Sequence, residues 1–349
     1  MGFTEKLDKA PLGLSFDDVL LLPQYSEVRL DEIDVSTRIT RRLRLNIPLI
    51  SSPMDTVTGR EMAVALAKLG GLGVLPRNLG LRDTIAVVRE AKREGLRIAV
   101  AVGPFDDERV KSCVEAGADL IVVDTAHGQS RNVIEATKRY KELGVDVVSG
   151  NVVTRSGAEA LIRAGADALR VGLGSGHACT TREVAGVGVP QLTAIAWVAD
   201  VAREVGVGVI ADGGVEAPAH VVKALAAGAD AVMLGYMLAG TDEAPGEIVE
   251  IEGRKYKPYR GMGSRGALES GSARYHGYKR VPEGVEGYVE YRGPVSRVVE
   301  TLVNALKQGM GYVGARSLEE LRERAVFVRI TSAGKYEGSP RGMLVTRWL

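Results

Sequence analysis

The sequence is poor in cysteine and in aromatic residues, and both shortages limit what it can encode. Of its 349 residues, 5% are aromatic and two are cysteines, Cys113 and Cys179. Two cysteines make no disulfide framework, which fits a reducing cytoplasm. With so few aromatic residues, the hydrophobic core has to be built from Val, Leu, Ile and Ala, which the 45% hydrophobic fraction supplies.

The sequence also lacks an excess of charge, a long apolar run and a metal-binding spacing. Its 45 basic and 44 acidic side chains nearly cancel, whereas nucleic-acid binding needs clustered basic residues. No apolar run reaches the ~18 residues of a membrane span, and residues 1–14 lack the apolar core of a signal peptide. No histidine or cysteine pair has zinc-ligand spacing. We expect a cytoplasmic protein that binds neither nucleic acid nor membrane.

What the sequence does contain is a series of eight short apolar segments, separated by stretches with apolar residues at i, i+3 and i+4. Uninterrupted apolar strands indicate burial on both faces, as in a parallel sheet covered by helices. Eight strand-and-helix repeats favour a closed (β/α)₈ barrel, the TIM barrel, over an open α/β sheet. The expected strands are residues 47–53, 72–75, 97–102, 119–124, 146–150, 168–172, 207–211 and 231–235.

A repeated phrase supports this phasing. The sequence Ala-Gly-Ala-Asp precedes three of the expected strands, at residues 116–119, 164–167 and 227–230. Each glycine falls just past a helix end, where a left-handed cap costs little. Because catalytic groups of such barrels lie at the opposite, carboxyl ends of the strands, we expect the functional residues there.

One such strand end carries a cysteine in a glycine-rich loop. Residues 172–182 (GLGSGHACTTR) follow the sixth expected strand, and their glycines can turn backbone groups toward a ligand or ion. A flexible surface turn explains the glycines equally well, but the position at a strand end favours Cys179 as a nucleophile. The loop does not open a helix after the first strand, so it is not a Rossmann turn. Cys113 falls in an expected helix and is predicted to be a core residue.

Two further segments are candidate ligand sites. Residues 210–214 (IADGG) and Gly235 end the seventh and eighth strands, where such barrels often bind phosphate; a plain tight turn is the alternative. Residues 241–294 show little periodicity, and a loop this long is usually functional or mobile. Its cationic stretch at 257–264 could close over an anionic ligand, although the pattern alone favours a solvated surface loop. Amphipathic helices are expected at 295–309 and 318–325. His127 and His177 fall at strand ends, whereas His220 and His276 do not.

Several long motifs in the right order resemble the IMP dehydrogenase/GMP reductase superfamily, and IMP dehydrogenase within it. They are residues 14–23 (LSFDDVLLLP), 51–57 (SSPMDTV), 123–128 (VDTAHG), 150–154 (GNVVT), 179–182 (CTTR) and 259–264 (YRGMGS). The resemblance implies one catalytic barrel domain over residues 1–349, with a flap at about 241–294 and a C-terminal tail at 326–349. Most dehydrogenases of this family carry a regulatory CBS module before the third strand. Residues 89–95 instead run straight into residues 96–100, so we expect no CBS domain.

The resemblance implies NAD-dependent oxidation of IMP to XMP, a step of guanine nucleotide (GMP) biosynthesis. Cys179 would attack C2 of the purine, hydride would pass to NAD⁺, and the adduct would be hydrolysed. A cysteine suits this role because its thiolate is strongly nucleophilic near neutral pH and leaves again readily. The flap arginine of an Arg-Tyr pair activates water in the family, which points to Arg274 with Tyr275 beside it. Thr181 would assist at that water.

The resemblance also assigns binding residues. NAD would be held by Asp124, Thr125 and Gly172. A monovalent cation, K⁺, would be coordinated by Gly174, Gly176 and Cys179, with Glu337, Gly338 and Ser339 of a neighbouring subunit of a homotetramer. The expected contacts to the purine, ribose and phosphate of IMP are Ser52, Met54, Asn151, Arg170, His177, Asp212, Gly214, Gly235, Tyr236, Tyr259, Gly261, Met262, Gly263 and Glu283.

Two positions depart from the family pattern. His177 and Tyr236 stand where the family has serines that bind phosphate. Both side chains can still donate to phosphate; alternatively, the pocket belongs to a paralogue that takes another purine nucleotide. GMP reductase, which converts GMP to IMP with NADPH, is a second alternative, although it lacks the Arg-Tyr pair. A non-catalytic nucleotide sensor is a third, and the presence of Cys179, Thr181 and Arg274 speaks against it.

Overall fold

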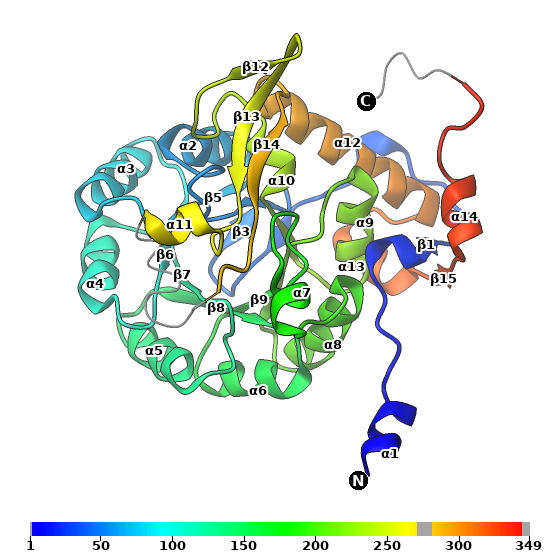
Figure 1. Cartoon of the computed structure of the whole chain (residues 1–349), viewed down its shortest axis with the longest axis horizontal. Helices are drawn as coiled ribbons and strands as arrows, with labels where there is room; N and C mark the ends of the chain where they lie inside the picture. Colours follow the sequence, from blue (N-terminus) through cyan, green and yellow to red (C-terminus); the bar gives the residue numbers. More distant parts are fainter. Residues whose placement is uncertain (1, 271–280, 344–349) are drawn as a thin grey trace.

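The computed structural model describes residues 2–270 and 281–343. Eight parallel strands of this part close into a barrel in sequence order, β4 to β11, inside a ring of helices (Figure 1). The predicted (β/α)₈ fold is confirmed. The barrel strands are β4 (Leu49–Ser51), β5 (Leu72–Leu75), β6 (Ile98–Val102), β7 (Leu120–Asp124), β8 (Asp146–Val152), β9 (Ala168–Val171), β10 (Gly208–Asp212) and β11 (Ala231–Leu234).

The strands form where the apolar segments predict them because both of their faces are buried. Alternate side chains, such as Ile50, Leu72 and Val122, form one hydrophobic cluster inside the barrel. The others pack outward against the helices in a second cluster, and each fully buried aliphatic side chain contributes about 1.5–3 kcal/mol. The surrounding helices are α2 (Arg60–Lys68), α3 (Leu81–Arg93), α4 (Asp107–Ala116), α5 (Arg131–Lys141), α6 (Arg155–Arg163), α8 (Gln191–Glu204), α9 (Pro218–Ala226) and α12 (Val295–Val313).

A short hairpin closes the amino-terminal end of the barrel. Its strands are β2 (Thr37–Arg38) and β3 (Arg44–Leu45), and it adds Ile39, Leu43 and Leu45 to the inner cluster. The carbonyl oxygen of Ile39 lies 2.0 Å from where a Cβ on Gly208 would be. A residue other than glycine at the start of β10 would therefore push the hairpin out of the barrel.

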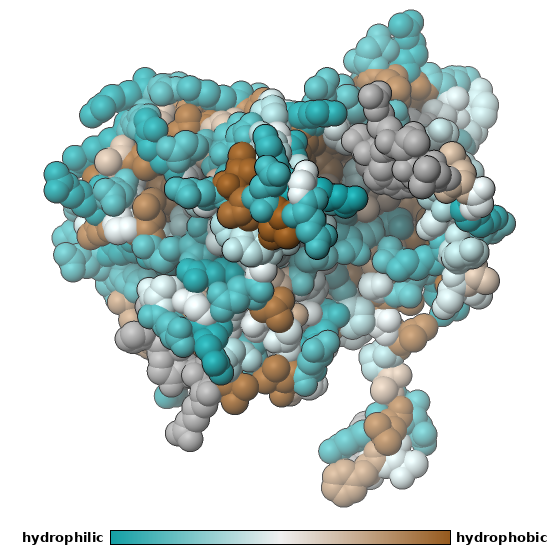
Figure 2. Space-filling view, turned by 45° about the horizontal axis from the view of Figure 1, so that its top comes forward, coloured by the Kyte–Doolittle hydropathy of each residue, from teal (hydrophilic) through white to brown (hydrophobic). Residues whose placement is uncertain are grey.

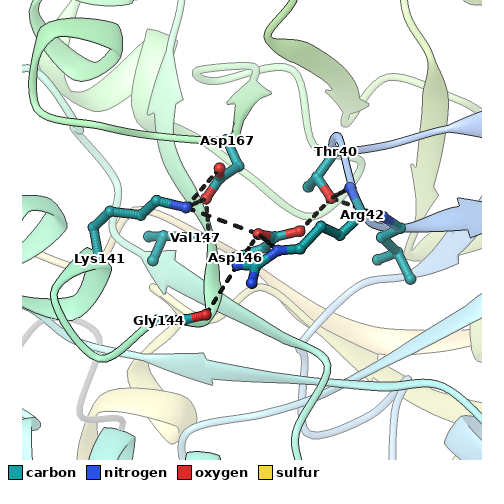
Figure 3. A network of polar contacts seen from close by, with 8 residues as sticks. Thr40, Arg42, Lys141, Gly144, Asp146, Val147 and Asp167 are labelled. Atoms are coloured by element: carbon teal, nitrogen blue, oxygen red, sulfur yellow. Dashed lines mark hydrogen bonds and ion pairs between the residues drawn. The ribbon is translucent and has the colours of Figure 1, made fainter.

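The same hairpin brings a polar network to this end (Figure 3). Asp146, the first residue of β8, is only 4% exposed. Its carboxylate accepts hydrogen bonds from the hydroxyl of Thr40 and from Nε of Arg42, the latter at 2.7 Å. Beside it, Nζ of Lys141 lies 2.6 Å from Oδ2 of Asp167. Each buried carboxylate at this end is thus paired with a cation, as its burial requires.

The three Ala-Gly-Ala-Asp phrases form a structural repeat at this end. Their glycines have φ of 100°, 95° and 112°, the left-handed geometry that the sequence predicts. Their aspartates each accept a backbone N–H from a neighbouring strand, at 2.8–2.9 Å, and pair with a helix cation. These sets are Asp119 with Ile98 and Lys92, Asp167 with Val147 and Lys141, and Asp230 with Val209 and Arg203.

The segment after β11 is more regular than the sequence indicates. The prediction of a long loop at 241–294 is wrong for its described part. The short helix α10 (Tyr236–Ala239) precedes this part, which holds an antiparallel sheet of β12 (Val249–Ile251), β13 (Arg254–Arg260) and β14 (Glu286–Glu290), with α11 (Arg265–Glu269). The alternation along β13 is hidden because a lysine takes a core position: Lys257 is buried, and its ammonium donates to the carbonyl of Thr241 at 3.0 Å.

An N-terminal and a C-terminal strand pair on one side of the barrel. The strand β1 (Val19–Leu21) pairs with β15 (Phe327–Arg329), followed by α14 (Ser332–Glu337). Three short elements, η1 (Phe16–Asp18), η2 (Leu30–Glu32) and α13 (Leu318–Arg324), pack on α9 and α12. The first helix, α1 (Phe3–Asp8), stands apart from the barrel with exposed apolar side chains (Figures 1 and 2). Among the described residues, no helix has the length and apolar character to cross a membrane.

Candidate active site

A pocket of about 970 Å³ opens at the carboxyl ends of the barrel strands. Its wall is formed by strand ends, by the glycine-rich loop after β9 and by Tyr259, residues 261–263 and Glu283 of the flap. The sequence-predicted residues that line it are Ser52, Met54, Thr125, Asn151, Arg170, Gly172, Gly174, Gly176, Cys179, Thr181, Asp212, Tyr259, Gly261, Met262, Gly263 and Glu283. The structure therefore brings together most of the predicted site from positions far apart in the chain.

Cys179 is the first member of a chain of polar contacts. Its Sγ lies 3.2 Å from Oγ1 of Thr181, at the start of α7 (Thr181–Ala185). Thr181 in turn donates to Oε2 of Glu283 at 2.8 Å. Because the threonine hydrogen is directed to the carboxylate, the thiol donates to the threonine oxygen. The three groups form a path along which the thiol proton can leave.

The backbone of the cysteine loop has a fixed shape. Gly172 has φ of 150°, and a Cβ there would lie 1.9 Å from the carbonyl oxygen of Asp212, so only glycine fits. The amide of Cys179 donates to the carbonyl of Gly176 at 3.0 Å. Arg182 donates from Nη2 to the carbonyl of Leu173 at 3.3 Å. Burial lowers the pKa of Arg182, but an arginine keeps its charge in proteins, so the loop is held by a cation.

Four strand ends are joined by a buried ion-pair network. Arg170, at the end of β9, is 1% exposed and lies between two carboxylates. It donates to Asp124 at the end of β7, and its Nε lies 2.9 Å from Oδ2 of Asp212 on β10. Asn151 on β8 donates to the same Asp212 oxygen at 2.8 Å. The network fixes Asp212, whose side chain remains 15% exposed in the pocket wall.

Asn151 also offers an unused acceptor. Its Nδ2 donates to the carbonyl of Gly172 at 2.8 Å as well as to Asp212, which fixes the orientation of the amide. Its Oδ1 is buried and has no hydrogen-bond partner within the described part of the chain. A buried unpaired acceptor costs about 1–3 kcal/mol. Its place in the wall of the pocket suits a donor on a bound ligand.

The flap sheet packs directly on the cysteine loop. The carbonyl of Ala178 accepts the amide of Val285 at 3.0 Å, and a Cβ on Gly261 would lie 2.4 Å from that oxygen. Tyr259 of β13 lines the pocket. Burial, with the carboxylate of Asp212 nearby, raises the pKa of Tyr259 far above its ordinary value of 10.0. Its phenol therefore stays protonated and can donate to a ligand.

The two residues that depart from the family pattern contact each other. The rings of His177 and Tyr236 stack with centroids 3.9 Å apart. Cζ of Arg292 lies over the Tyr236 ring, 4.6 Å from its centroid, and Nδ1 of His177 lies 3.4 Å from a carboxylate oxygen of Glu216. This stack lies beside the pocket lining rather than within it. Gly235 directly precedes Tyr236 in the chain, and a Cβ on Gly235 would contact Met54.

Other predicted site residues fall outside the lining. Asp124 is buried against Arg170, and Gly214 lies one residue beyond the lining residue Gly213. Glu337 ends α14, away from the loop of its own chain, and is followed by Gly338 and Ser339. Arg274 and Tyr275 lie outside the described residues. Within the described ranges, no cluster of three or more His, Cys, Asp and Glu side chains could hold a metal ion.

A second set of lining residues, which we call the second half of the pocket, was not singled out by the sequence. Arg77, Phe105, Asp106, Ser130 and Asn132 line it, together with His127, which the sequence does place at a strand end. Phe105 is 66% exposed. Nε of Arg77 lies 3.2 Å from Oδ2 of Asp106. These residues follow the carboxyl ends of β5, β6 and β7, so strand position was the signal that could have identified them.

Comparison with known proteins agrees with this geometry. The family model described as IMP dehydrogenase / GMP reductase domain matches residues 13–341. The chain is 40% identical to the inosine-5′-monophosphate dehydrogenase of Aquifex aeolicus over 96% of each chain. It is 43% identical to that of Cryptosporidium parvum, covering 93% of this chain and 94% of the relative.

The enzyme of Methanocaldococcus jannaschii is 38% identical and is covered over 98% of its length, against 99% of this chain. That alignment extends over 486 positions, more than the 349 residues present here. The relative therefore contains residues with no counterpart in this chain. Together, the barrel, the cysteine loop and these matches show that the chain belongs to the IMP dehydrogenase/GMP reductase family of oxidoreductases.

Proposed function

We propose that the protein oxidises IMP to XMP with NAD⁺ through a covalent adduct on Cys179. The observation that carries this proposal is the contact chain from Cys179 through Thr181 to Glu283 in the wall of a nucleotide-sized pocket. A nucleophilic thiol needs a route for its proton, and this chain supplies one. The relatives named as IMP dehydrogenases support the choice of substrate.

The residues account for each bond change. As the Sγ–C2 bond forms, the C2=N3 double bond opens onto N3, and the thiol proton moves to Thr181 while Thr181 passes its own proton to Glu283. The C2–H bond then breaks, its electron pair leaves as hydride, and the C2=N3 double bond is restored. Water later adds to C2, the Sγ–C2 bond breaks, and the thiolate regains a proton as XMP departs. We assign activation of this water to Arg274 and Tyr275, on the resemblance alone.

The pocket has the features that a purine ribonucleotide requires. Asp212 presents a carboxylate that can accept from ribose hydroxyls, and Arg170 and Asn151 hold it in place. The unpaired Oδ1 of Asn151 can accept one further donor. Protonated Tyr259, which also lines the pocket, can donate to the ligand. These groups bind and orient the substrate so that its C2 meets the thiol.

The second half of the pocket fits a dinucleotide. Phe105 offers an exposed aromatic face to a base, and Arg77, Thr125 and His127 offer polar contacts along the same wall. When bound there, NAD⁺ supplies the acceptor for the hydride from C2. The role of this chain is to hold it and to keep the reacting carbon out of bulk water.

A monovalent cation completes the proposal. The loop supplies backbone carbonyls at Gly174, Gly176 and Cys179, and carbonyl oxygens are suitable donors for K⁺. We assign the remaining ligands to Glu337, Gly338 and Ser339 of a neighbouring subunit in a homotetramer. Light scattering of the native protein and activity in KCl against LiCl test this assignment; a monomer with full activity in LiCl would contradict it.

The direct experiment follows the reduced dinucleotide by absorbance. IMP with NAD⁺ and KCl should produce NADH, whereas GMP with NADPH should leave the absorbance unchanged. Loss of NADPH with GMP, and no reaction with IMP, would instead assign the protein as a GMP reductase.

A second candidate is the same chemistry on another purine nucleotide. The stack of His177 on Tyr236 supports it, because two aromatic rings take the place of two small phosphate ligands beside Gly235. If IMP and GMP are both inert, a panel of purine nucleosides and nucleotides, screened by thermal shift, should show stabilisation by the true ligand.

A further inference from the structure

His220 connects the N-terminal segment to the wall of the active site. It lies in the first turn of α9 and is 5% exposed. Its Nε2 lies 3.1 Å from Oδ1 of Asp17 in η1, and Phe16 stacks on the ring with centroids 5.1 Å apart. Lys335 of α14 donates to the other oxygen of Asp17 at 2.8 Å. The imidazole is therefore anchored on one side by η1, whose Asp17 is held in turn by α14.

The other side of the ring faces the turn after β10. Nδ1 lies 3.3 Å from the amide nitrogen of Glu216 and 3.3 Å from the carbonyl oxygen of Gly214. A ring nitrogen either accepts from the amide or donates to the carbonyl. In both protonation states, Nδ1 therefore bonds the same turn, residues 212–216.

This turn also forms one side of the cysteine loop. Gly213 and Gly214 have φ of 98° and 75°, so two successive left-handed residues bend the chain. A Cβ on Gly213 would lie 2.6 Å from Oγ of Ser175 and 3.1 Å from the amide of Gly176. Ser175 also donates to the carbonyl of Asp212 at 3.4 Å. A shift of the turn would therefore move both the ribose-facing carboxylate and the loop of Cys179.

We propose that His220 is a positioning residue for the active site, which holds the turn 212–216 through Nδ1 and so sets Asp212 and the cysteine loop. It touches neither the substrate nor the thiol itself. Two consecutive glycines resist distortion poorly on their own, and a buried ring anchored to Asp17 supplies the missing constraint. The effect on IMP recognition rests on the proposed function, whereas the effect on the cysteine loop does not.

Two substitutions separate the two sides of the ring. His220→Asn places an amide near the position of Nδ1 and keeps a contact to the turn. His220→Gln reaches toward Asp17 and leaves the turn without a partner. Val222→Ala is the matched control, because Val222 lies on the same helix, is buried and packs toward Gly309 on α12. We expect Val222→Ala to lower the free energy of unfolding without changing a contact of the turn 212–216.

Two readouts are measured on the full-length protein. The first is KM for IMP in the NADH assay, where we expect His220→Gln to raise KM about tenfold, since small displacements in a site carry such penalties. The second is the rate at which iodoacetamide alkylates Cys179, with Cys179→Ala as the blank. Cys113 is fully buried and reacts little. We expect His220→Gln to change this rate at least about threefold, and His220→Asn and Val222→Ala to stay within about twofold of wild type.

The outcome is decided by the pattern across variants. Unchanged KM and alkylation in His220→Gln, or equal effects in the Asn and Gln variants, would overturn the proposal. If His220→Gln does not fold, Asp17→Ala releases the opposite side of the ring and should change both readouts in the same direction; no change there overturns it as well. If wild type does not oxidise IMP, the proposed function fails, yet the alkylation rates still test the role of His220.

Discussion

The two ends of the barrel treat their polar groups in opposite ways. At the amino-terminal end, Asp146 is buried and Asp167 is largely covered, and both accept several hydrogen bonds and are paired with cations (Figure 3). At the carboxyl end, a pocket opens, a thiol is partly exposed and the Oδ1 of Asn151 is left unpaired among the described residues. One end thus satisfies its polar groups internally, and the other leaves groups ready for a ligand.

One ion-pair network at the carboxyl end of the barrel is nevertheless satisfied internally, as the polar groups at the amino-terminal end are. Arg170 is only 1% exposed and is paired with both Asp124 and Asp212. It does not stand ready for a ligand, but it holds Asp212, which does. The comparison therefore separates side chains that contact a ligand from side chains that hold those contacting residues in place. Each prediction below tests one side of that division.

The largest effect is expected from removing the nucleophile. Cys179→Ala should lower the rate of NADH formation at least about 10³-fold, because no other group can form the adduct. The melting temperature should stay near that of wild type, since Cys179 is only partly buried. Cys113→Ala is the matched control: it should lower stability and leave the rate unchanged. Equal rates in Cys179→Ala and wild type would place the chemistry elsewhere.

At the opposite end, the expected loss is in stability. Asp146→Ala leaves Thr40 and Arg42 without their shared acceptor, and breaking a buried ion pair typically costs about 3–5 kcal/mol; because Arg42 is well exposed, we expect the lower limit. Urea unfolding measures the change. The kcat at 25 °C should equal that of wild type, and a large loss of kcat in a folded variant would mean that the two ends are coupled.

Removing the middle of the proton path should have an intermediate effect. Thr181→Val keeps the shape of the side chain but removes the hydroxyl between the thiol and Glu283. The expected loss in kcat is about 10²-fold, typical of general acid–base catalysis. Thr180→Val provides a neighbouring control. Rapid-mixing absorbance should show that the hydride burst itself slows; a normal burst would assign Thr181 to the hydrolysis step alone.

A smaller effect is expected in the second half of the pocket. Phe105→Ala should raise KM for NAD⁺ about tenfold through lost stacking on a base, which is worth about 1–3 kcal/mol. Because Phe105 is 66% exposed, stability should hardly change. Steady-state titration of NAD⁺ and of IMP separates the two sites. An increase in KM for IMP alone would mean that Phe105 faces the purine instead.

The smallest effect concerns acid stability at the edge of the site. Partial burial raises the pKa of Asp17, but the hydrogen bond from Lys335 and the neighbouring His220 outweigh this and hold it below its ordinary value of 3.8. A lowered carboxylate pKa stabilises the folded protein above the unfolded value, and that stability is lost as the pH falls through the folded value. Lys335→Met should therefore cost less than about 1 kcal/mol near pH 7.

This cost should fade on acidification below pH 3.8, once Asp17 is protonated in both proteins. Thermal melts of wild type and Lys335→Met from pH 7 to pH 3 give the comparison. A difference that grows toward low pH would show that the Lys335 contact acts through a group other than Asp17.

The barrel could be predicted from the sequence because its signals are local. Strands buried on both faces are continuous apolar runs, and the glycine of each Ala-Gly-Ala-Asp phrase marks a helix end. The flap sheet could not, because β13 pairs with a strand more than twenty residues away and places Lys257 in its core. No periodicity within a short window reveals such a pairing.

The site could be predicted only in part, for the same reason. The loop of Cys179 is one continuous motif, so the sequence located it. The roles of Arg77 and His220 depend on neighbours distant in the chain: His220 meets Asp17, 203 residues away. The position of His220 in the sequence, two residues after the start of α9, does not indicate that it contacts the turn 212–216. Positioning residues of this kind become visible only when the fold is known.

The central claim is that the purine is bound covalently to Cys179 during turnover. Acid quenching of the protein a few milliseconds to seconds after mixing with IMP and NAD⁺, followed by mass spectrometry of its peptides, tests it most directly. We predict a peptide containing Cys179 that carries the mass of IMP less two hydrogens, absent when NAD⁺ is omitted. NADH formation with no modified Cys179 peptide at any quench time would contradict the account.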